Sequence, residues 1–270
     1  MRRPQNRRWL SIDPRVWLAL AFALTGCGPR PVADAPPVVR LHVAAASDLQ
    51  AALPELVERF RVGRPGVEVV PTFGSSGQLA EQIKAGAPFD LFLAANQTFV
   101  ADLAKTGLVV PDSVAPYAIG SLVVVVPADA ANPVTALAHL ARADVKKVAI
   151  ANPDTAPYGS AAREVLKKAG LWEGLQPRLV IAESVRQALQ FAQTGNVEAA
   201  LVGRAISKAP GLRVVEIDGT LYAPIVQAIG VVAASEHRAE AGAFRAFVLG
   251  ESGQSVLEAR GFKRAPLAGP

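Results

Sequence analysis

Short β-branched runs alternate with segments of helical periodicity along most of this sequence, and this alternation is the feature that most constrains its fold. The run at residues 38–45 is followed by apolar residues that recur every three or four positions from Leu49 to Phe60. Parallel strands need crossover helices, whereas antiparallel strands are joined by tight turns, so the pattern predicts an α/β fold with a mostly parallel sheet. The other expected strands are at 67–72, 91–95, 121–127, 148–151, 178–181, 199–202, 212–217 and 225–234, and the other expected helices are at 79–85, 99–106, 161–169, 185–193, 243–249 and 254–260.

Two long apolar runs, at 121–127 and 225–234, divide the chain into two sets of strand and helix units. A continuous apolar run is typical of a strand that is buried on both faces. Two sets that are joined by two such strands predict two lobes with two crossover segments. The first lobe is expected to comprise residues 38–120 and 223–270, and the second lobe residues 121–222.

The N-terminal segment indicates export and lipid attachment. Residues 1–26 combine five arginines with an apolar stretch at 16–24, which is shorter than the ~20 residues that a membrane-spanning helix needs. This stretch ends in Leu24-Thr25-Gly26 before Cys27, which resembles the bacterial lipoprotein signal, whose cleavage leaves a lipid-modified cysteine. We therefore predict a signal peptide at 1–26, a proline-rich tether at 27–37, and a mature protein in the periplasm or at the cell surface that Cys27 anchors to the membrane.

Charge and cysteine content exclude two classes of function. Residues 1–26 hold those five arginines and one acid, Asp13, so their removal lowers the net charge from +5 to +1. Nucleic-acid binders carry clustered Lys and Arg, and we therefore expect no nucleic-acid partner. Cys27 is the only cysteine of the sequence, which excludes a disulfide or a cysteine metal site in the mature domain.

Four strand-to-helix junctions carry small or hydroxyl residues where a helix would begin. A helix N-terminus has unpaired N–H groups and a partial positive charge, so it can bind an anion without a cationic side chain. In α/β sheets such junctions gather at the carboxyl ends of the strands, where ligands bind. Helix capping alone accounts for each junction taken singly, whereas their conjunction favours an anion site. The junctions are Ala46-Ser47-Asp48-Leu49, Phe73-Gly74-Ser75-Ser76-Gly77, Ala156-Pro157-Tyr158-Gly159-Ser160 and Ala182-Glu183-Ser184-Val185.

Neutral donors dominate these junctions. The first three contain no Lys or Arg, and only Arg186 follows the fourth. An anion would then be held by backbone and hydroxyl dipoles rather than by a permanent ion pair. A protonated ligand needs an acceptor, which we expect the site to lack, so the sequence predicts a fully ionised oxyanion.

Four segments are similar to those of one known family, and the similarity extends over nearly all of residues 40–262. They are Ala44-Ala45-Ala46-Ser47, Phe73-Gly74-Ser75-Ser76, Ala85-Gly86-Ala87-Pro88-Phe89-Asp90-Leu91-Phe92 and Ala182-Glu183-Ser184-Val185-Arg186-Gln187-Ala188-Leu189. In these segments the chain resembles the periplasmic molybdate-binding proteins of ABC transporters.

This resemblance implies the type II periplasmic-binding-protein fold, in which two lobes close on the ligand. It also implies a monomer without a cofactor that captures molybdate or tungstate and delivers it to the permease of an ABC importer. By motif position, the ligand-binding residues would be Ser47, Ser76, Tyr158 and Val185, the last through its backbone N–H.

Two departures from the family pattern affect the expected ligand contacts. Some members have a tyrosine where this chain has Gly203, and we expect Tyr158 to supply the missing phenolic donor from another loop. Asp48 follows Ser47, and its carboxylate would repel a dianion. We expect Asp48 to turn away, to cap its helix and to offer only its backbone N–H.

A hydrolase is the first alternative function, with a serine as its nucleophile. Such a serine needs a base that a third group orients. No histidine lies in a junction, and we therefore expect no enzymatic activity. The candidate serines are Ser47, Ser76 and Ser160, and the histidines are His42, on the first strand, His139 and His237.

A metal-cation binder and a binder of another oxyanion are the further alternatives. A cation site would need clustered His, Asp, Glu or Tyr ligands, whereas the acids near the junctions are scattered. Sulfate or phosphate would suit the same fold, because discrimination between oxyanions depends on cavity radius and protonation. The scattered acids are Asp48, Asp90, Asp154 and Glu183.

Overall fold

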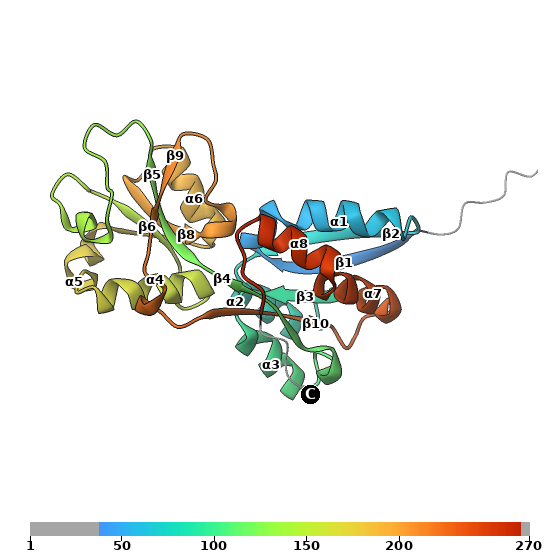
Figure 1. The fold of residues 1–270 in the computed structure, drawn as a ribbon. Coiled ribbons are helices and arrows are strands. Elements are labelled where there is room, and N and C mark those ends of the chain that lie inside the picture. Colours follow the sequence, from blue (N-terminus) through green and yellow to red (C-terminus); the bar gives the residue numbers. More distant parts are fainter. Residues whose placement is uncertain (1–37, 266–270) are drawn as a thin grey trace, which may run out of the picture. The chain divides into compact units, whose positions relative to one another are not determined.

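Residues 38–265 are described by the structure, a computed structural model (Figure 1). The predicted signal peptide, Cys27 and the predicted tether lie outside the described residues, as do residues 266–270. Within 38–265, no helix is both long enough and apolar enough to cross a lipid bilayer.

The first sheet has the strand order β2-β1-β3-β10-β4. Strand β1 is parallel to β2 and β3, and β10 is antiparallel to β3 and β4. Helices α1, α7 and α8 cover one face of this sheet, and α2 and α3 cover the other (Figure 1). The elements are β1 (Val39–Ala46), α1 (Leu53–Val62), β2 (Val67–Gly74), α2 (Ser76–Lys84), β3 (Leu91–Ala94), α3 (Gln97–Lys105), β4 (Ala115–Gly120), β10 (Ile225–Val231), α7 (Arg238–Leu249) and α8 (Glu251–Ala259).

The second sheet has the strand order β7-β6-β8-β5-β9. Strand β6 is parallel to β7 and β8, whereas β5 is antiparallel to β8 and β9. Strand β5 has five consecutive buried residues, as expected for an apolar run with protein on both faces. The elements are β5 (Leu122–Pro127), β6 (Val148–Ala151), α4 (Pro157–Lys168), α5 (Trp172–Leu175), β7 (Leu179–Ala182), α6 (Val185–Gln193), β8 (Ala199–Gly203) and β9 (Leu212–Glu216).

The predicted α/β class is confirmed, and each sheet is mixed because one strand, β10 in the first and β5 in the second, runs antiparallel to the other four. The chain leaves the first sheet after Gly120, forms the whole second sheet, and returns to the first at Ile225. Strands β5 and β10 each follow a passage from the other sheet, and no crossover helix of their own sheet precedes them. They therefore run antiparallel to their neighbours.

Helix starts differ from the expected ones for a common reason. Helices α2, α4 and α7 begin at Ser76, Pro157 and Arg238, between three and five residues before the predicted positions. Their first turns are polar or small and lack the apolar spacing on which the prediction relied. After β1 the error is the opposite, because Ser47–Ala51 is a short 3-10 helix, η2, and α1 starts only at Leu53. Strand β4 and helix α5 were not predicted.

Aromatic packing holds the C-terminal helices to α1. The ring of Phe244 lies 5.0 Å from that of Phe60, edge to face, and 6.4 Å from that of Phe247. Phe244 is fully buried and belongs to the core between α1, α7 and the first sheet. The return of the chain to the first sheet is therefore secured by side chains as well as by the pairing of β10.

Replacement of Phe244 by alanine should lower the free energy of unfolding by about 3–5 kcal/mol, because it removes a buried ring and leaves a cavity. The measurement is urea denaturation followed by circular dichroism. Val62→Ala is the matched control, since Val62 is 88% exposed at the end of α1 and its change should be within about 0.5 kcal/mol. Equal effects of the two substitutions would contradict this description of the core.

Candidate functional site

All four predicted ligand residues line one small cavity. It lies where the first turns of α2, α4 and α6 meet η2. Each of these turns follows a strand, so the cavity occupies the carboxyl ends of strands from both sheets, as predicted. Its lining residues are Ala46, Ser47, Asp48, Gly74, Ser75, Ser76, Ala95, Ala156, Pro157, Tyr158 and Val185.

On the side of the first sheet, the adjacent residues Ser75 and Ser76 make different hydrogen bonds. The Ser75 Oγ caps α2 by accepting from the Gln78 N–H at 3.4 Å. The Ser76 Oγ accepts from the Ala95 N–H at 2.9 Å, so the hydroxyl proton of Ser76 is available to another acceptor. Ser47 begins η2 and is also buried. Ser47 and Ser76 therefore bring hydroxyl groups to a site that water barely reaches.

On the side of the second sheet, the contacts come from the starts of α4 and α6. Pro157 occupies the first turn of α4, where its lack of an N–H costs no helical bond. Ser184 caps α6 through the Gln187 N–H, and the N–H of Val185, the first helical residue, has no acceptor within its own helix. Tyr158 and Val185 are both buried. The predicted backbone donor thus lies at the cavity wall.

A backbone hydrogen bond joins the two sides. The Gly77 N–H, in the first turn of α2, donates to the Thr155 carbonyl at 2.9 Å, in the loop before α4. A Cβ at position 77 would lie 2.7 Å from that carbonyl oxygen, so only glycine allows this approach. Gly77 therefore sets the distance between the starts of α2 and α4.

The electrostatic field in the cavity comes from neutral groups and one acid. Among the described lining residues there is no Lys, Arg or His. The positive potential is that of the N–H groups at the first turns of α2, α4 and α6. Asp48 is the acid, and it changes the chemistry of the site.

Asp48 belongs to a buried hydrogen-bond network that links the first sheet to helix α4. Its Oδ2 accepts from the Tyr158 hydroxyl at 2.9 Å and from the Gln227 Nε2. The Gln227 Nε2 also donates to the Tyr158 oxygen at 3.1 Å, and the Gln227 Oε1 accepts from the Tyr117 hydroxyl. All four side chains are buried. The network joins η2, α4, β4 and β10.

The expectation that Asp48 caps its helix is wrong. The cap residue of η2 is Ala46, and no side chain caps this helix. The Asp48 carboxyl group, which is fully buried, instead accepts the two bonds at Oδ2, while Oδ1 is buried without a hydrogen-bond partner. Burial raises the pKa of Asp48 to about 6, against the opposing effect of the bonds from Gln227 and Tyr158 and of the backbone N–H groups of Asp48 and Leu49. The cavity is therefore not lined by donors alone, as the sequence analysis assumed.

Tyr158 lies in the cavity wall, but its hydroxyl proton is directed to Asp48. Burial, and then the negative charge of Asp48, raise the pKa of Tyr158 well above its ordinary value, so the phenol stays protonated. Gly203 is adjacent: a Cβ there would lie 3.1 Å from the Tyr158 ring. The absence of a side chain at Gly203 thus provides the space that the ring of Tyr158 occupies.

The other candidates from the sequence lie away from the cavity. Asp90 is buried and accepts from the His42 N–H at 2.7 Å and the Ser235 hydroxyl at 2.6 Å, so it links β1 to the chain after β10. Asp154 pairs with Arg163. Within 38–265 no three His, Cys, Asp or Glu side chains gather closely enough to hold a metal ion. Among the described residues, the candidates that do not line the cavity are His42, Asp90, His139, Asp154, Ser160, Glu183 and His237.

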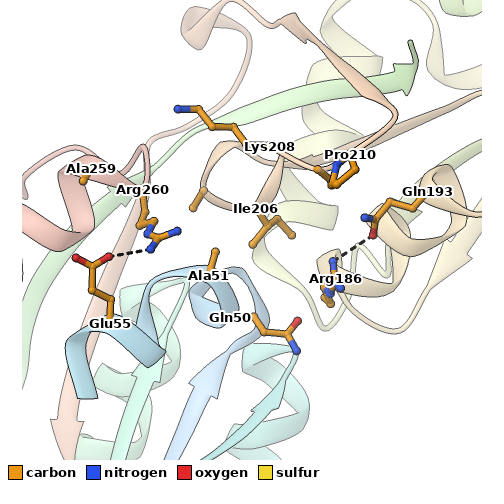
Figure 2. A pocket seen from close by; sticks show the side chains of 12 residues that line it. Gln50, Ala51, Glu55, Arg186, Gln193, Ile206, Lys208, Pro210, Ala259 and Arg260 are labelled. Carbon is orange, nitrogen blue, oxygen red and sulfur yellow. Dashed lines mark hydrogen bonds and ion pairs between the residues drawn. The ribbon is translucent and has the colours of Figure 1, made fainter. Parts of the chain in front are cut away.

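A larger and more open hollow lies beside η2 (Figure 2). Four of its polar side chains are bound in pairs: Glu55 pairs with Arg260, and the Arg186 guanidinium donates to the Gln193 side chain. These groups do not converge on one point, whereas buried hydroxyl and N–H groups converge on the small cavity. The small cavity is therefore the better candidate for ligand binding.

The family to which the chain belongs follows from comparison with known proteins. Residues 41–263 match the family model of the bacterial extracellular solute-binding proteins. The chain belongs to this family.

Individual solute-binding proteins are similar over most of their length. The molybdate-binding protein ModA of Azotobacter vinelandii is 33% identical over 255 residues, which cover 92% of this chain and 96% of that protein. A putative ABC transporter substrate-binding lipoprotein of Bacillus subtilis, YvgL, is 31% identical and covers 85% and 88% of the two chains. The solved periplasmic molybdate-binding protein of A. vinelandii superposes with a TM-score of 0.77 at 31% identity, covering 84% of this chain and all of that one. The sequence-based assignment to this family is confirmed.

Gln227 and Tyr117 are the two members of the Asp48 network that do not line the cavity, and the sequence analysis did not predict either of them. Gln227 lies within the apolar run of β10, and Tyr117 lies on the unpredicted strand β4. A buried amide in the middle of an apolar strand requires partners, so the isolated glutamine was the available signal.

Introduction of tyrosine at position 203 should lower the free energy of unfolding by about 1–3 kcal/mol, because the new side chain and Tyr158 need the same space. The backbone of Gly203 has φ −67°, which any residue adopts, so the cost is steric. In the double variant with Tyr158→Ala the cost should be smaller than the sum of the single effects, as a urea double-mutant cycle measures.

Gly219→Tyr serves as the control for this cycle, since a Cβ at position 219 meets no atom within 4 Å. Strict additivity of the position 203 and position 158 effects would show that the two side chains do not compete.

Proposed function

We propose that this solute-binding protein captures a tetrahedral oxyanion, with molybdate or tungstate as the ligand, and delivers it to the permease of an ABC importer. The observation that carries the proposal is the convergence of Ser47, Ser76, Tyr158 and Val185 on one buried cavity that has no cation among its described lining residues. The names of similar proteins support molybdate in particular, since the A. vinelandii relative is a molybdate-binding protein.

Binding would depend on dipoles that are fixed within each part of the chain before the two parts close. The hydroxyl groups of Ser47 and Ser76 and the first-turn N–H of Val185 each donate to an anion oxygen. Because the donors are held by strands, caps and packing, they need little reordering when water is displaced. A dianion that is bound by dipoles alone can be desolvated and still released to the permease, whereas a buried ion pair would hold it more firmly.

Closure of the two parts of the chain is the proposed conformational step. The ligand would first contact the donors of η2 and α2, and closure would then bring α4 and α6 to it, so binding shifts the population towards the closed form. The hinge would lie near Ile119-Gly120 and Tyr222-Ala223, where the chain passes between the sheets.

We propose binding without catalysis. A nucleophilic serine needs a nearby base. Among the described residues that line the cavity there is no histidine, and Asp48 is bonded to Tyr158 and Gln227 rather than to a serine. The cavity groups are thus arranged to hold an anion.

Membrane attachment through Cys27 completes the proposal, with the protein acting as a monomer in the periplasm or at the cell surface. The sequence before Cys27 supports lipidation, and the B. subtilis relative is named a lipoprotein. A tether would keep the binding domain close to its permease and raise the local concentration there.

Molybdate and tungstate should raise the melting temperature of the purified protein more than sulfate, phosphate or ferric ion do, because a ligand that binds only the folded state stabilises it. Differential scanning fluorimetry with each ion in turn measures this. If only sulfate, phosphate or iron raises the melting temperature, the proposed ligand is wrong, although the chain remains a solute-binding protein.

Ser76→Ala should weaken molybdate binding by about 10- to 150-fold, the effect of losing one hydrogen bond to a charged group. Isothermal titration calorimetry gives the affinity. Ser160→Ala is the control, since Ser160 is exposed on α4 and does not line the cavity. Unchanged affinity in the Ser76 variant would remove this hydroxyl from the site.

Cys27→Ala should abolish incorporation of a labelled fatty acid into the protein, because Cys27 is the only cysteine that can carry the lipid. The measurement is metabolic labelling followed by purification of the wild-type and variant chains. A wild-type protein without label would exclude the lipid anchor.

A further inference from the structure

The Asp48 carboxyl group has one oxygen that the protein leaves without a partner. Oδ2 is held by Tyr158 and Gln227, whereas Oδ1 is buried and accepts no hydrogen bond. Asp48 is 0% exposed and lines the same cavity as Ser47 and Ser76. An unpaired buried polar atom is costly, so its presence in the cavity wall requires an explanation.

Two negative charges would meet if an ionised Asp48 faced a bound dianion. No cation among the described cavity residues would offset them. Desolvated like charges in contact repel strongly, and the usual outcome is that one of the two groups takes up a proton. Protonation of Oδ1 removes the repulsion and also converts an unpaired acceptor into a donor, which is what an anion oxygen needs.

We propose that Asp48 is a direct ligand of the anion, and that in the occupied site its Oδ1 carries a proton that it donates to an anion oxygen. The proton comes from solvent, stays on the carboxyl group, and leaves Oδ2 free to keep its bonds from Tyr158 and Gln227. The inference rests on the proposed function, and it assigns to Asp48 a role opposite to the repulsion expected from the sequence.

The groups around Asp48 support proton uptake at this residue rather than elsewhere. The pKa of Asp48 is already raised to about 6 by burial, and the charge of a bound dianion raises it further. Burial raises the pKa of Tyr117 and of Tyr158 well above their ordinary values, so both phenols stay neutral. Tyr222 binds the Leu122 N–H through its hydroxyl oxygen.

Charged side chains on the elements that pack against η2 have partners of their own. On α1, Glu55 is paired with Arg59 and Arg260. On α6, Arg186 donates to Gln193, and on the short helix after β8, Arg204 pairs with Glu216. These groups line the open hollow or the surface, so none replaces the proton on Asp48.

The sign of the pH dependence follows from this assignment. Below about pH 6 Asp48 is protonated with or without the anion, so affinity is independent of pH. Above about pH 6 the free protein loses the proton and must regain it on binding, so affinity falls by up to about tenfold per pH unit.

The experiment is calorimetric titration of the full-length protein with molybdate from about pH 6.5 to about pH 8.5, where molybdate remains a dianion. Wild-type affinity should fall with rising pH, by roughly 30- to 100-fold across the range. In Asp48→Asn, whose amide N–H mimics the protonated carboxyl, affinity should stay constant and exceed that of the wild type at the high end. Asp154→Asn, at an exposed acid paired with Arg163, should keep the wild-type slope.

Proton uptake is measured directly on the wild type by repeating the titration at about pH 7.5 in buffers of different ionisation enthalpy. Uptake of nearly one proton for each anion bound is expected, whatever the fate of the variants. Tight binding with no proton uptake and a flat pH profile would overturn the role of Asp48 and leave the proposed function intact. No binding of molybdate, tungstate or sulfate at any pH would overturn the proposed function itself.

Discussion

The hydrogen bond from the Gly77 N–H to the Thr155 carbonyl is the contact on which the cavity depends. It joins the first turn of α2 to the loop that leads into α4, and it forms only because position 77 has no side chain. Helix N-termini on two different sheets face one space as a result. Each start is ordinary in its local chemistry, with serine caps on α2 and α6 and a proline in the first turn of α4. Their convergence produces a site that no single junction could form.

The polar network behind the cavity ties the site to the passages between the sheets. Gln227 lies on β10, the strand by which the chain returns, and Tyr117 lies on β4, the strand by which it leaves. Through these two residues, Asp48 and Tyr158 are hydrogen-bonded to the strands next to the proposed hinge. A rearrangement of these strands would alter the bonds to the Asp48 carboxyl, and with them its tendency to bind a proton.

The fold class, most of the elements and the residues that line the cavity could be predicted from the sequence, because strand runs, helical spacing and the serine and glycine junctions are all local patterns. The antiparallel entry of β5 and β10 could not, since it follows from the path of the chain through the second sheet. The hydrogen-bond partners of Asp48 could not be predicted from the sequence either. Its partners Tyr158 and Gln227 lie 110 and 179 residues away, so no local pattern around Asp48 indicates them. Helix starts were misplaced where first turns are polar, which is where the cavity lies.

The complementary fit of Gly203 and Tyr158 restricts how such a site can change during evolution. A bulky residue at one position crowds a bulky residue at the other, because the ring of Tyr158 occupies the space that a side chain at 203 would need. A lineage that moved its aromatic group from one loop to the other by first adding the new ring would therefore lose stability at that step. A lineage that passed through small residues at both positions would avoid this crowding.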